Sequence, residues 1–394
     1  MDNNIYFDNN ATTQIHPEVF EAMLPYINGK FFGNSSSLHS YGRKAKEAIE
    51  LARFQIATAI NCQPNDIIFT SGGSEANNLI IKSGIVDKNK IIAISNIEHP
   101  CVSQPAWQLT QWQSKVKLIL SNDNGEIDKQ SITNLFANNK NNVDDFALIS
   151  VMYANNESGV INNVAEIAKE IKQQNNNIVF HSDAVQAFGK VAINFTDLHN
   201  NFGVDAMSIS SHKIYGPQGI GALVVSQDID ILPLISGGGQ ERGLRSGTEN
   251  VAAIVGFGAA AKLVNENLQQ NFQHYKALQQ CLENGLKELG AIIFGDEATN
   301  KLANTTYFSL AENLDGATLV SLLDANGFSV ATGSACSSGR ARISHVLQAM
   351  NIAPEWSSAA VRISFGINNT IEEVKQFLYV LQKVKNKLLN LKSI

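Results

Sequence analysis

A lysine closes a short apolar run in this chain, in the string Ser210-Ser211-His212-Lys213. Open α/β sheets bind ligands outside the carboxyl ends of their strands, which is where Lys213 lies if residues 206–210 form a strand. A lysine amine at such a place can form a Schiff base with an aldehyde. Taken alone, Lys213 is more readily interpreted as a surface lysine in a turn, so its assignment depends on partners elsewhere in the sequence.

A carboxylate and an amide follow a second apolar run, at residues 178–180. At the end of a strand, Asp183 can keep a pyridine nitrogen protonated, which makes the ring an electron sink. Gln186, about one helical turn later, can donate a hydrogen bond to a ring oxygen. For Asp183 alone, capping of the next helix is an equal alternative.

A glycine turn between a strand and a helix offers a phosphate site. After the run 67–70 the chain continues as Ser71-Gly72-Gly73-Ser74. Exposed N–H groups and a hydroxyl at a helix start suit a phosphate dianion. The string 245–248, which ends in Thr248, adds a cation and a second hydroxyl. Glycine turns are common, but beside an aldehyde-reactive lysine and a pyridine partner this one predicts pyridoxal 5'-phosphate (PLP) as cofactor.

A histidine and an asparagine close two further strands. His99 follows the run 91–95, and its imidazole can stack on the cofactor ring and move protons near neutral pH. A loop histidine with satisfied hydrogen bonds is the more ordinary interpretation of any single His. Asn156 belongs to the string 155–157, which can reach the same pocket.

One of four cysteines stands apart from the others. Cys336 lies among small residues and glycines at 331–339, which predicts an exposed loop whose thiol can approach a substrate and withdraw. Cys62, Cys101 and Cys281 are interpreted as structural thiols. Since no C-x-x-C pair occurs, a disulfide scaffold and a closed zinc site are excluded, and no metal site is predicted.

The elements that position these residues alternate between short apolar runs and helical periodicity. Continuous apolar runs are typical of strands that are covered on both faces. We expect such strands at 67–70, 91–95, 116–120, 146–152, 178–181, 206–210 and 221–225. Helical periodicity is clearest at 164–173, and a long helical stretch follows at 249–289. The pattern predicts an α/β domain with a mostly parallel sheet and a smaller α+β domain near 265–394.

Composition excludes several classes of protein. The formal net charge of the 394 residues is -6 and the sequence pI is about 5.8, which argues against nucleic-acid binding. No apolar stretch approaches the roughly 20 residues of a membrane helix. The first residues lack the basic and apolar regions of a signal peptide, so we expect a cytoplasmic protein.

Taken together, these residues resemble the cysteine desulfurases of the NifS/IscS type, which are class V aminotransferase-like PLP enzymes of fold type I. The Gly333-Ser334-Ala335-Cys336 form resembles their group I branch. The matching strings run in the family's order through nearly the whole chain, at 6–13, 33–39, 70–77, 98–99, 155–159, 183–186, 210–221, 242–248, 334–336 and 361–364.

The resemblance implies a role for each matching residue. Lys213 would bind PLP covalently, Asp183 would pair with the pyridinium, and Gln186 would contact the ring oxygen. His99 would stack on the ring and act as an acid and base, and Arg362 would grip the substrate carboxylate, as a planar bidentate donor can. Asn156 would lie over the cofactor near the substrate. The phosphate would be held by Gly73, Ser74, Ser210 and His212, with Thr248 reaching over from the second subunit of a homodimer.

The activity implied is removal of sulfur from L-cysteine. Cys336 would attack the substrate sulfur, which leaves a persulfide and releases L-alanine. The resemblance also implies a large domain over 15–264 and a small domain over 1–14 and 265–394. The sulfur would pass to an acceptor protein, such as an iron–sulfur scaffold or a tRNA-thiolation carrier. Selenocysteine lyase, or a binding protein that kept the fold and lost catalysis, are the alternatives.

Overall fold

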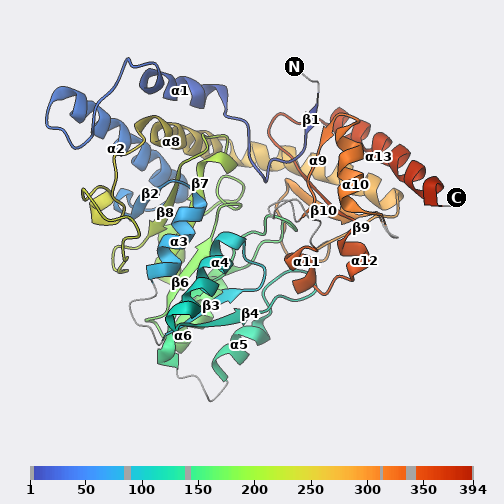
Figure 1. The fold of residues 1–394 in the computed structure, drawn as a ribbon, viewed down its shortest axis with the longest axis horizontal. Coiled ribbons are helices and arrows are strands. Elements are labelled where there is room, and N and C mark those ends of the chain that lie inside the picture. The colour runs from blue at the N-terminus through green and yellow to red at the C-terminus, as the bar shows by residue number, and fades with distance from the viewer. Residues whose placement is uncertain (1–3, 84–89, 138–142, 311–313, 334–342, 393–394) are drawn as a thin grey trace.

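A seven-stranded sheet forms the centre of the larger part of the molecule in the computed structural model, which describes residues 4–83, 90–137, 143–310, 314–333 and 343–392 (Figure 1). Its order is β2-β8-β7-β6-β5-β3-β4, and only β8 runs antiparallel to its neighbours. The predicted mostly parallel sheet is therefore confirmed. The strands are β2 (Ile67–Thr70), β3 (Ile91–Ser95), β4 (Lys115–Ile119), β5 (Phe146–Ser150), β6 (Val179–Asp183), β7 (Ala206–Ser210) and β8 (Gly221–Val225).

Helices cover both faces of this sheet, which explains the continuous apolar runs. In β3, Ile92 and Ile94 pack in the core beneath α3 and α4, whereas Ile91 and Ala93 pack in the core beneath α2, α6 and α8. Successive side chains of a strand point to opposite faces, so a doubly covered strand has no polar side. The covering helices are α2 (Ser40–Ile60), α3 (Gly73–Ser83), α4 (Pro100–Gln108), α6 (Val164–Gln174) and α8 (Val251–Glu266).

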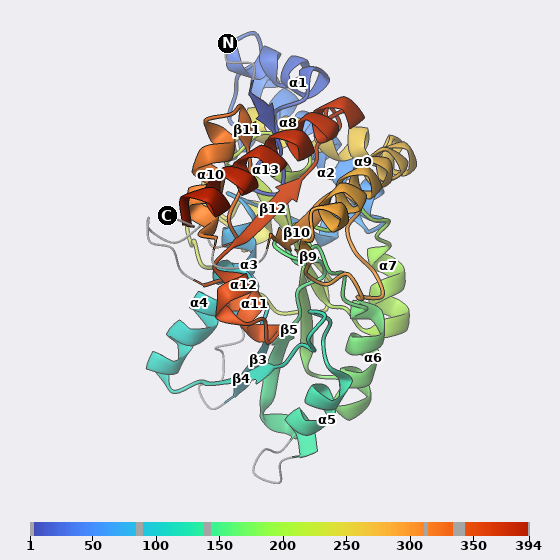
Figure 2. The same cartoon turned by 90° about the vertical axis from the view of Figure 1, so that its right-hand side faces the viewer.

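The C-terminal part is built around a small antiparallel sheet, with β10 (Thr305–Ser309) between β9 (Ile292–Ile293) and β12 (Ala360–Ser364). The N-terminal strand β1 (Ile5–Tyr6) joins this part by pairing in parallel with β11 (Phe328–Ser329). Figure 2 views this side, with α13 in front. The remaining helices are α1 (Pro17–Ile27), α5 (Lys129–Ala137), α7 (Phe195–Asp197), α9 (Leu268–Glu288), α10 (Gly316–Asp324), α11 (His345–Ala349), α12 (Pro354–Ser357) and α13 (Ile371–Lys392).

The helical stretch expected at 249–289 is in fact two helices. Asn267 ends α8 with φ -107° and ψ 9°, and its Nδ2 donates to the Leu263 carbonyl at 2.9 Å. An Asn side chain that bonds a nearby carbonyl competes with the helical ladder, which is why the helix breaks there. The break redirects the chain, since α8 packs in the core of the large sheet and α9 packs against α13 in a second core.

Two apolar clusters lie in different parts of the molecule. One lies under the large sheet, and the other gathers Phe7 with side chains of α9, β10, α10, β12 and α13. The exact boundaries, 15–264 against 1–14 with 265–394, stay a proposal, because Tyr307 and Leu347 of the C-terminal part pack into the first cluster. None of the helices in the described ranges is long and apolar enough to cross a membrane.

Candidate active site

A cavity of about 610 Å³ lies at the edge of the sheet where β3, β5, β6 and β7 end. Loops that leave parallel strands meet at one edge, so residues far apart in the sequence come together there. The N-terminal segment and β12 close the cavity from the side of the C-terminal part through Asn10 and Arg362. The predicted residues that are described line this cavity, with Thr248 as the exception.

The phosphate end of the cavity is built on the first turn of α3. Gly72 has a φ of +155°, and a Cβ on Gly73 would lie 2.7 Å from Val185 Cγ2, so both positions require glycine. Ser74 lies in the first turn, where helix N–H groups attract an anion. Ser210 is buried, and its hydroxyl has no hydrogen-bond partner among the described residues. This orphaned hydroxyl and the glycine cradle fit a phosphate, so the site suits PLP.

His212 lies beside this cradle as a neutral ring. Burial, followed by the charges of Lys213 and Lys190, lowers the pKa of His212 to about 4. Its Nδ1 lies 3.2 Å from Thr12 Oγ1. At neutral pH the imidazole is therefore uncharged, and it can contribute a hydrogen bond to the phosphate but no positive charge.

The pyridine end of the cavity is set by Asp183 at the end of β6. Its Oδ1 accepts from the Val185 N–H at 3.0 Å, and its Oδ2 accepts from Asn77 Nδ2 at 2.8 Å. These bonds orient the buried carboxylate. Lys213 Nζ donates to the carbonyls of Asn10 and Ala11, both at 2.6 Å. The amine is thereby held in the same cavity by the N-terminal segment.

His99 caps α4 and is held in one tautomer. Its Nδ1 accepts from the Cys101 N–H at 3.2 Å, so the proton of the neutral ring is on Nε2. Burial, with the charges of Lys213 and His345, lowers the pKa of His99, while Asp183 opposes the shift. His99 thus offers a neutral ring with an N–H that is available to donate, as stacking and proton transfer require.

Arg362 enters the cavity from β12. Its Nη1 donates to the Asn156 carbonyl at 3.0 Å, and its Nη2 pairs with Asp8 Oδ1 at 2.5 Å. The Nε of this buried guanidinium has no partner among the described residues. A carboxylate is the group that such a positioned donor binds best, which agrees with the predicted substrate role.

Glu98, next to His99, is a buried carboxyl group that holds its proton. Burial is the main cause, and the charge of Asp183 adds to it, so that the pKa of Glu98 rises to about 8. Ser95 Oγ donates to Oε1 at 2.7 Å, whereas Oε2 lacks a partner in the described part of the chain. At neutral pH the group is therefore mostly neutral.

This raised pKa predicts a dependence of stability on pH. The unfolded pKa of Glu is about 4.3. Protonated Glu98 therefore contributes fully to the free energy of unfolding below about pH 4. This contribution is lost as the pH rises towards about 8, the pKa of Glu98 in the folded protein. Glu98→Gln keeps the shape and the neutral state. We expect the melting temperature of Glu98→Gln relative to wild type to increase between about pH 5 and about pH 8. Glu288→Gln, at an exposed position, is the control. If the difference in melting temperature between Glu98→Gln and wild type does not change with pH, the pKa of Glu98 is not raised.

Cys101 is the residue whose place the sequence interpretation missed. Its Sγ lines the cavity, 2.9 Å from both His99 Nδ1 and Asn77 Nδ2. Its position two residues after His99, in the first turn of a helix capped by that histidine, was the available signal. Burial and the charge of Asp183 raise the pKa of the Cys101 thiol, so it is a poor thiolate despite its place.

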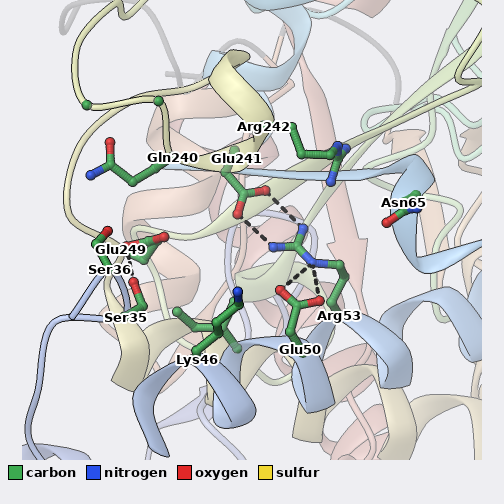
Figure 3. A pocket seen from close by; sticks show the side chains of 13 residues that line it. Ser35, Ser36, Lys46, Glu50, Arg53, Asn65, Gln240, Glu241, Arg242 and Glu249 are labelled. Atoms are coloured by element: carbon green, nitrogen blue, oxygen red, sulfur yellow. Dashed lines mark hydrogen bonds and ion pairs between the residues drawn. The ribbon is translucent and has the colours of Figure 1, made fainter. Parts of the chain in front are cut away.

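Two predicted residues are not among those that line the cavity in the described part of the chain. Cys336 lies outside the described residues. Thr248 is exposed on the loop before α8 and does not line the cavity of its own chain. A buried ion pair anchors the start of this loop, because Glu241 accepts from Arg53 Nη2 at 2.7 Å and from Nη1 at 2.9 Å (Figure 3). The described residues contain no cluster of metal-ligating side chains.

Comparison with known proteins identifies the family. The family model for class V aminotransferases matches residues 5–377. The cysteine desulfurase IscS of Dictyoglomus turgidum is 38% identical over 392 residues, which are 98% of this chain and 96% of that protein. A solved structure described as a NifS-like protein has a TM-score of 0.89 at 35% identity and covers 97% of this chain and 99% of its own.

A second solved structure, SspA in complex with cysteine, has a TM-score of 0.77 at 30% identity and covers 91% of this chain and 98% of its own. The match therefore extends over the sheet, the C-terminal part and the cavity between them. By sequence, fold and site, the chain belongs to the class V aminotransferase family and, within it, to the NifS/IscS-like cysteine desulfurases.

Proposed function

We propose that this chain is a PLP-dependent cysteine desulfurase that converts L-cysteine to L-alanine and transfers the sulfur to Cys336. The observation that carries the proposal is the meeting of Lys213, Asp183 and the unpartnered Ser210 hydroxyl in one cavity. An amine, a pyridinium partner and a phosphate ligand are what PLP requires of a protein. The similarity to a solved complex with cysteine supports the choice of substrate.

Each residue has a distinct task in this proposal. Bound PLP supplies an electron sink for the substrate, and Asp183 keeps that sink effective by holding the pyridine nitrogen protonated. Arg362 binds the substrate carboxylate and orients the amino acid. Lys213 would hold the cofactor through its amine and would also move a proton to or from the substrate. The Nε2–H of His99 is a second proton donor in the same cavity.

Cys336 takes the sulfur in the last chemical step. Its thiolate attacks the substrate sulfur, so an S–S bond forms while the C–S bond of the substrate breaks. The carbon gains a proton, and the products are L-alanine and an enzyme persulfide. Atoms and electrons balance without an external oxidant or reductant.

The direct test is to supply the full chain with PLP and L-cysteine, together with a reducing thiol that releases the persulfide as sulfide. Alanine and sulfide should appear in equal amounts. A parallel assay replaces L-cysteine by L-selenocysteine. Alanine formed only in that assay would favour the alternative of a selenocysteine lyase. Binding of PLP without either product would favour a binding protein that has lost catalysis.

A homodimer is part of this proposal. Large apolar side chains are exposed on α1, on α2 and between them, notably Phe32 (64% exposed) and Leu38 (91%). Exposed apolar patches of this kind mark association surfaces. The loop that carries Thr248 lies in contact with this region, since Glu249 accepts from Ser35 Oγ at 2.7 Å (Figure 3). A twofold partner docked there would bring Thr248 to its phosphate site.

We expect the wild-type chain to sediment as a dimer at micromolar concentration. Leu38→Glu places a charge in the apolar surface and should weaken dimerisation by about tenfold or more. Tyr379→Glu, at an exposed position on α13, is the matched control and should leave the dimer intact. An active wild-type monomer would contradict the proposal.

The sulfur acceptor and the location complete the proposal. We expect the persulfide to pass to an acceptor protein, either an iron–sulfur scaffold or a tRNA-thiolation carrier, in the cytoplasm. Mass spectrometry of proteins that gain sulfur from the persulfide-loaded enzyme would distinguish the two acceptors.

A further inference from the structure

Lys190 places an amine beside the cavity without lining it. The residue follows a short turn that leaves β6, in which the Lys190 N–H donates to the Ala187 carbonyl at 3.0 Å. Gly189 allows this turn, because its φ is +75° and a Cβ there would lie 2.7 Å from Ile214 Cγ2. The turn thereby brings the Lys190 amine into contact with the side chain of Gln186, four residues earlier.

Two contacts fix the amide of Gln186 from opposite sides. Lys190 Nζ donates to Gln186 Oε1 at 2.5 Å, and Gln186 Nε2 donates to the Asn10 carbonyl at 3.0 Å. Gln186 is buried and lines the cavity. If the amide were flipped, its oxygen would face the Asn10 carbonyl, so the hydrogen bond to Asn10 would be lost, and its NH₂ would face the amine that now donates to its oxygen. The observed orientation is therefore fixed, and Nε2 keeps a second N–H that is not used by Asn10.

The surroundings of the Lys190 amine differ from those of an ordinary structural lysine. Lys172, for comparison, pairs with Asp205 at 2.6 Å. Among the described residues Lys190 has no carboxylate partner, and its second contact is Asn10 Oδ1 at 3.3 Å. Burial, with the charges of Lys213 and Arg362, lowers the pKa of Lys190 well below its ordinary value. The amine donates to two amide oxygens, and both belong to residues that line the cavity.

We propose that Lys190 is a positioning residue, which locks the Gln186 amide with its nitrogen directed at the ring oxygen of PLP. The inference rests on the proposed role of Gln186 and extends it by one residue. Lys190 itself need not touch the cofactor. It acts through a single hydrogen bond, and any donor of suitable reach at this position can replace it.

A double-mutant cycle on the full chain tests this link. The quantities measured are the dissociation constant of PLP by equilibrium dialysis and the visible absorbance of the bound cofactor as a function of pH. The variants are Lys190→Met, Gln186→Ala and the double mutant. Lys190→Arg is the conservative variant. Lys301→Met is the control, because burial also lowers the pKa of Lys301, but this lysine lies outside the cavity lining.

We expect Lys190→Met to weaken PLP binding by about tenfold, the scale of one lost hydrogen bond. Its absorbance change should have the same direction as that of Gln186→Ala. In the Gln186→Ala background the further effect of Lys190→Met should fall below about twofold. Lys190→Arg should restore the wild-type spectrum, and Lys301→Met should leave it unchanged.

The outcomes separate this inference from the one on which it rests. Equal effects of Lys190→Met in both backgrounds would overturn the positioning role, because the amine would then act independently of Gln186. A normal spectrum in Lys190→Met beside an altered one in Gln186→Ala would also overturn it. An unchanged spectrum in Gln186→Ala would instead refute the proposed role of Gln186. If Lys190→Met does not fold, failure of Lys190→Arg to retain the wild-type spectrum decides against the proposal.

Discussion

Replacement of Lys213 by alanine is expected to remove the visible absorbance of bound PLP and to reduce alanine formation by about a thousandfold or more, the scale of losing a covalent group in other enzymes. The reason is geometric. Lys213 Nζ is held in the cavity by the carbonyls of Asn10 and Ala11, at the edge of the sheet where Asp183 and Ser210 also end their strands.

Lys190 also donates to residues that line the cavity, but its amine is occupied by the Gln186 and Asn10 side chains. It is therefore not placed to replace Lys213. The control is Lys262→Ala, which removes an exposed lysine of α8 and should leave both readouts unchanged. Near-normal alanine formation by Lys213→Ala would refute the assignment of this lysine.

The sheet and the cavity could be predicted because both follow from local patterns. Doubly covered strands are continuous apolar runs, and the functional residues Asp183, Ser210 and His99 stand just where such runs end. The carboxyl ends of parallel strands share one edge, so the sequence order of these residues was enough to bring them together.

Contacts made over long distances in the sequence could not be predicted in this way. Asn10 bonds Gln186 and Lys213 from the far end of the chain. The bond from Lys190 to Gln186 is local in the sequence, but it depends on the exact turn at Gly189, which periodicity does not show. Cys101 followed His99 visibly in the sequence, but its approach to Asn77 on α3 depends on how two helices pack. Such positions are set by tertiary packing rather than by periodicity.

Replacement of Cys336 by serine is expected to separate the two halves of the reaction. The proposed PLP ligands Lys213, Asp183 and Ser210 are unchanged in Cys336→Ser, so this variant should bind the cofactor as wild type does. Its absorbance should still change when L-cysteine is added. Release of alanine and sulfide should stop, because a hydroxyl is a far weaker nucleophile towards sulfur than a thiolate.

The other cysteines provide the controls, and Cys101 is the most informative of them because it lines the cavity. Burial raises the pKa of its thiol and that of Cys62, which disfavours the reactive thiolate at both positions. Cys62→Ser, Cys101→Ser and Cys281→Ser should therefore stay active, with at most about 1–2 kcal/mol of lost stability. In Cys101→Ser the hydroxyl can still bond Asn77.

Sulfide and alanine release are measured for all four variants beside the cofactor spectrum. If Cys101→Ser stops sulfur release while Cys336→Ser does not, the sulfur acceptor is Cys101 and the assignment of Cys336 is wrong. Loss of PLP from Cys336→Ser would show instead that residue 336 has a structural role.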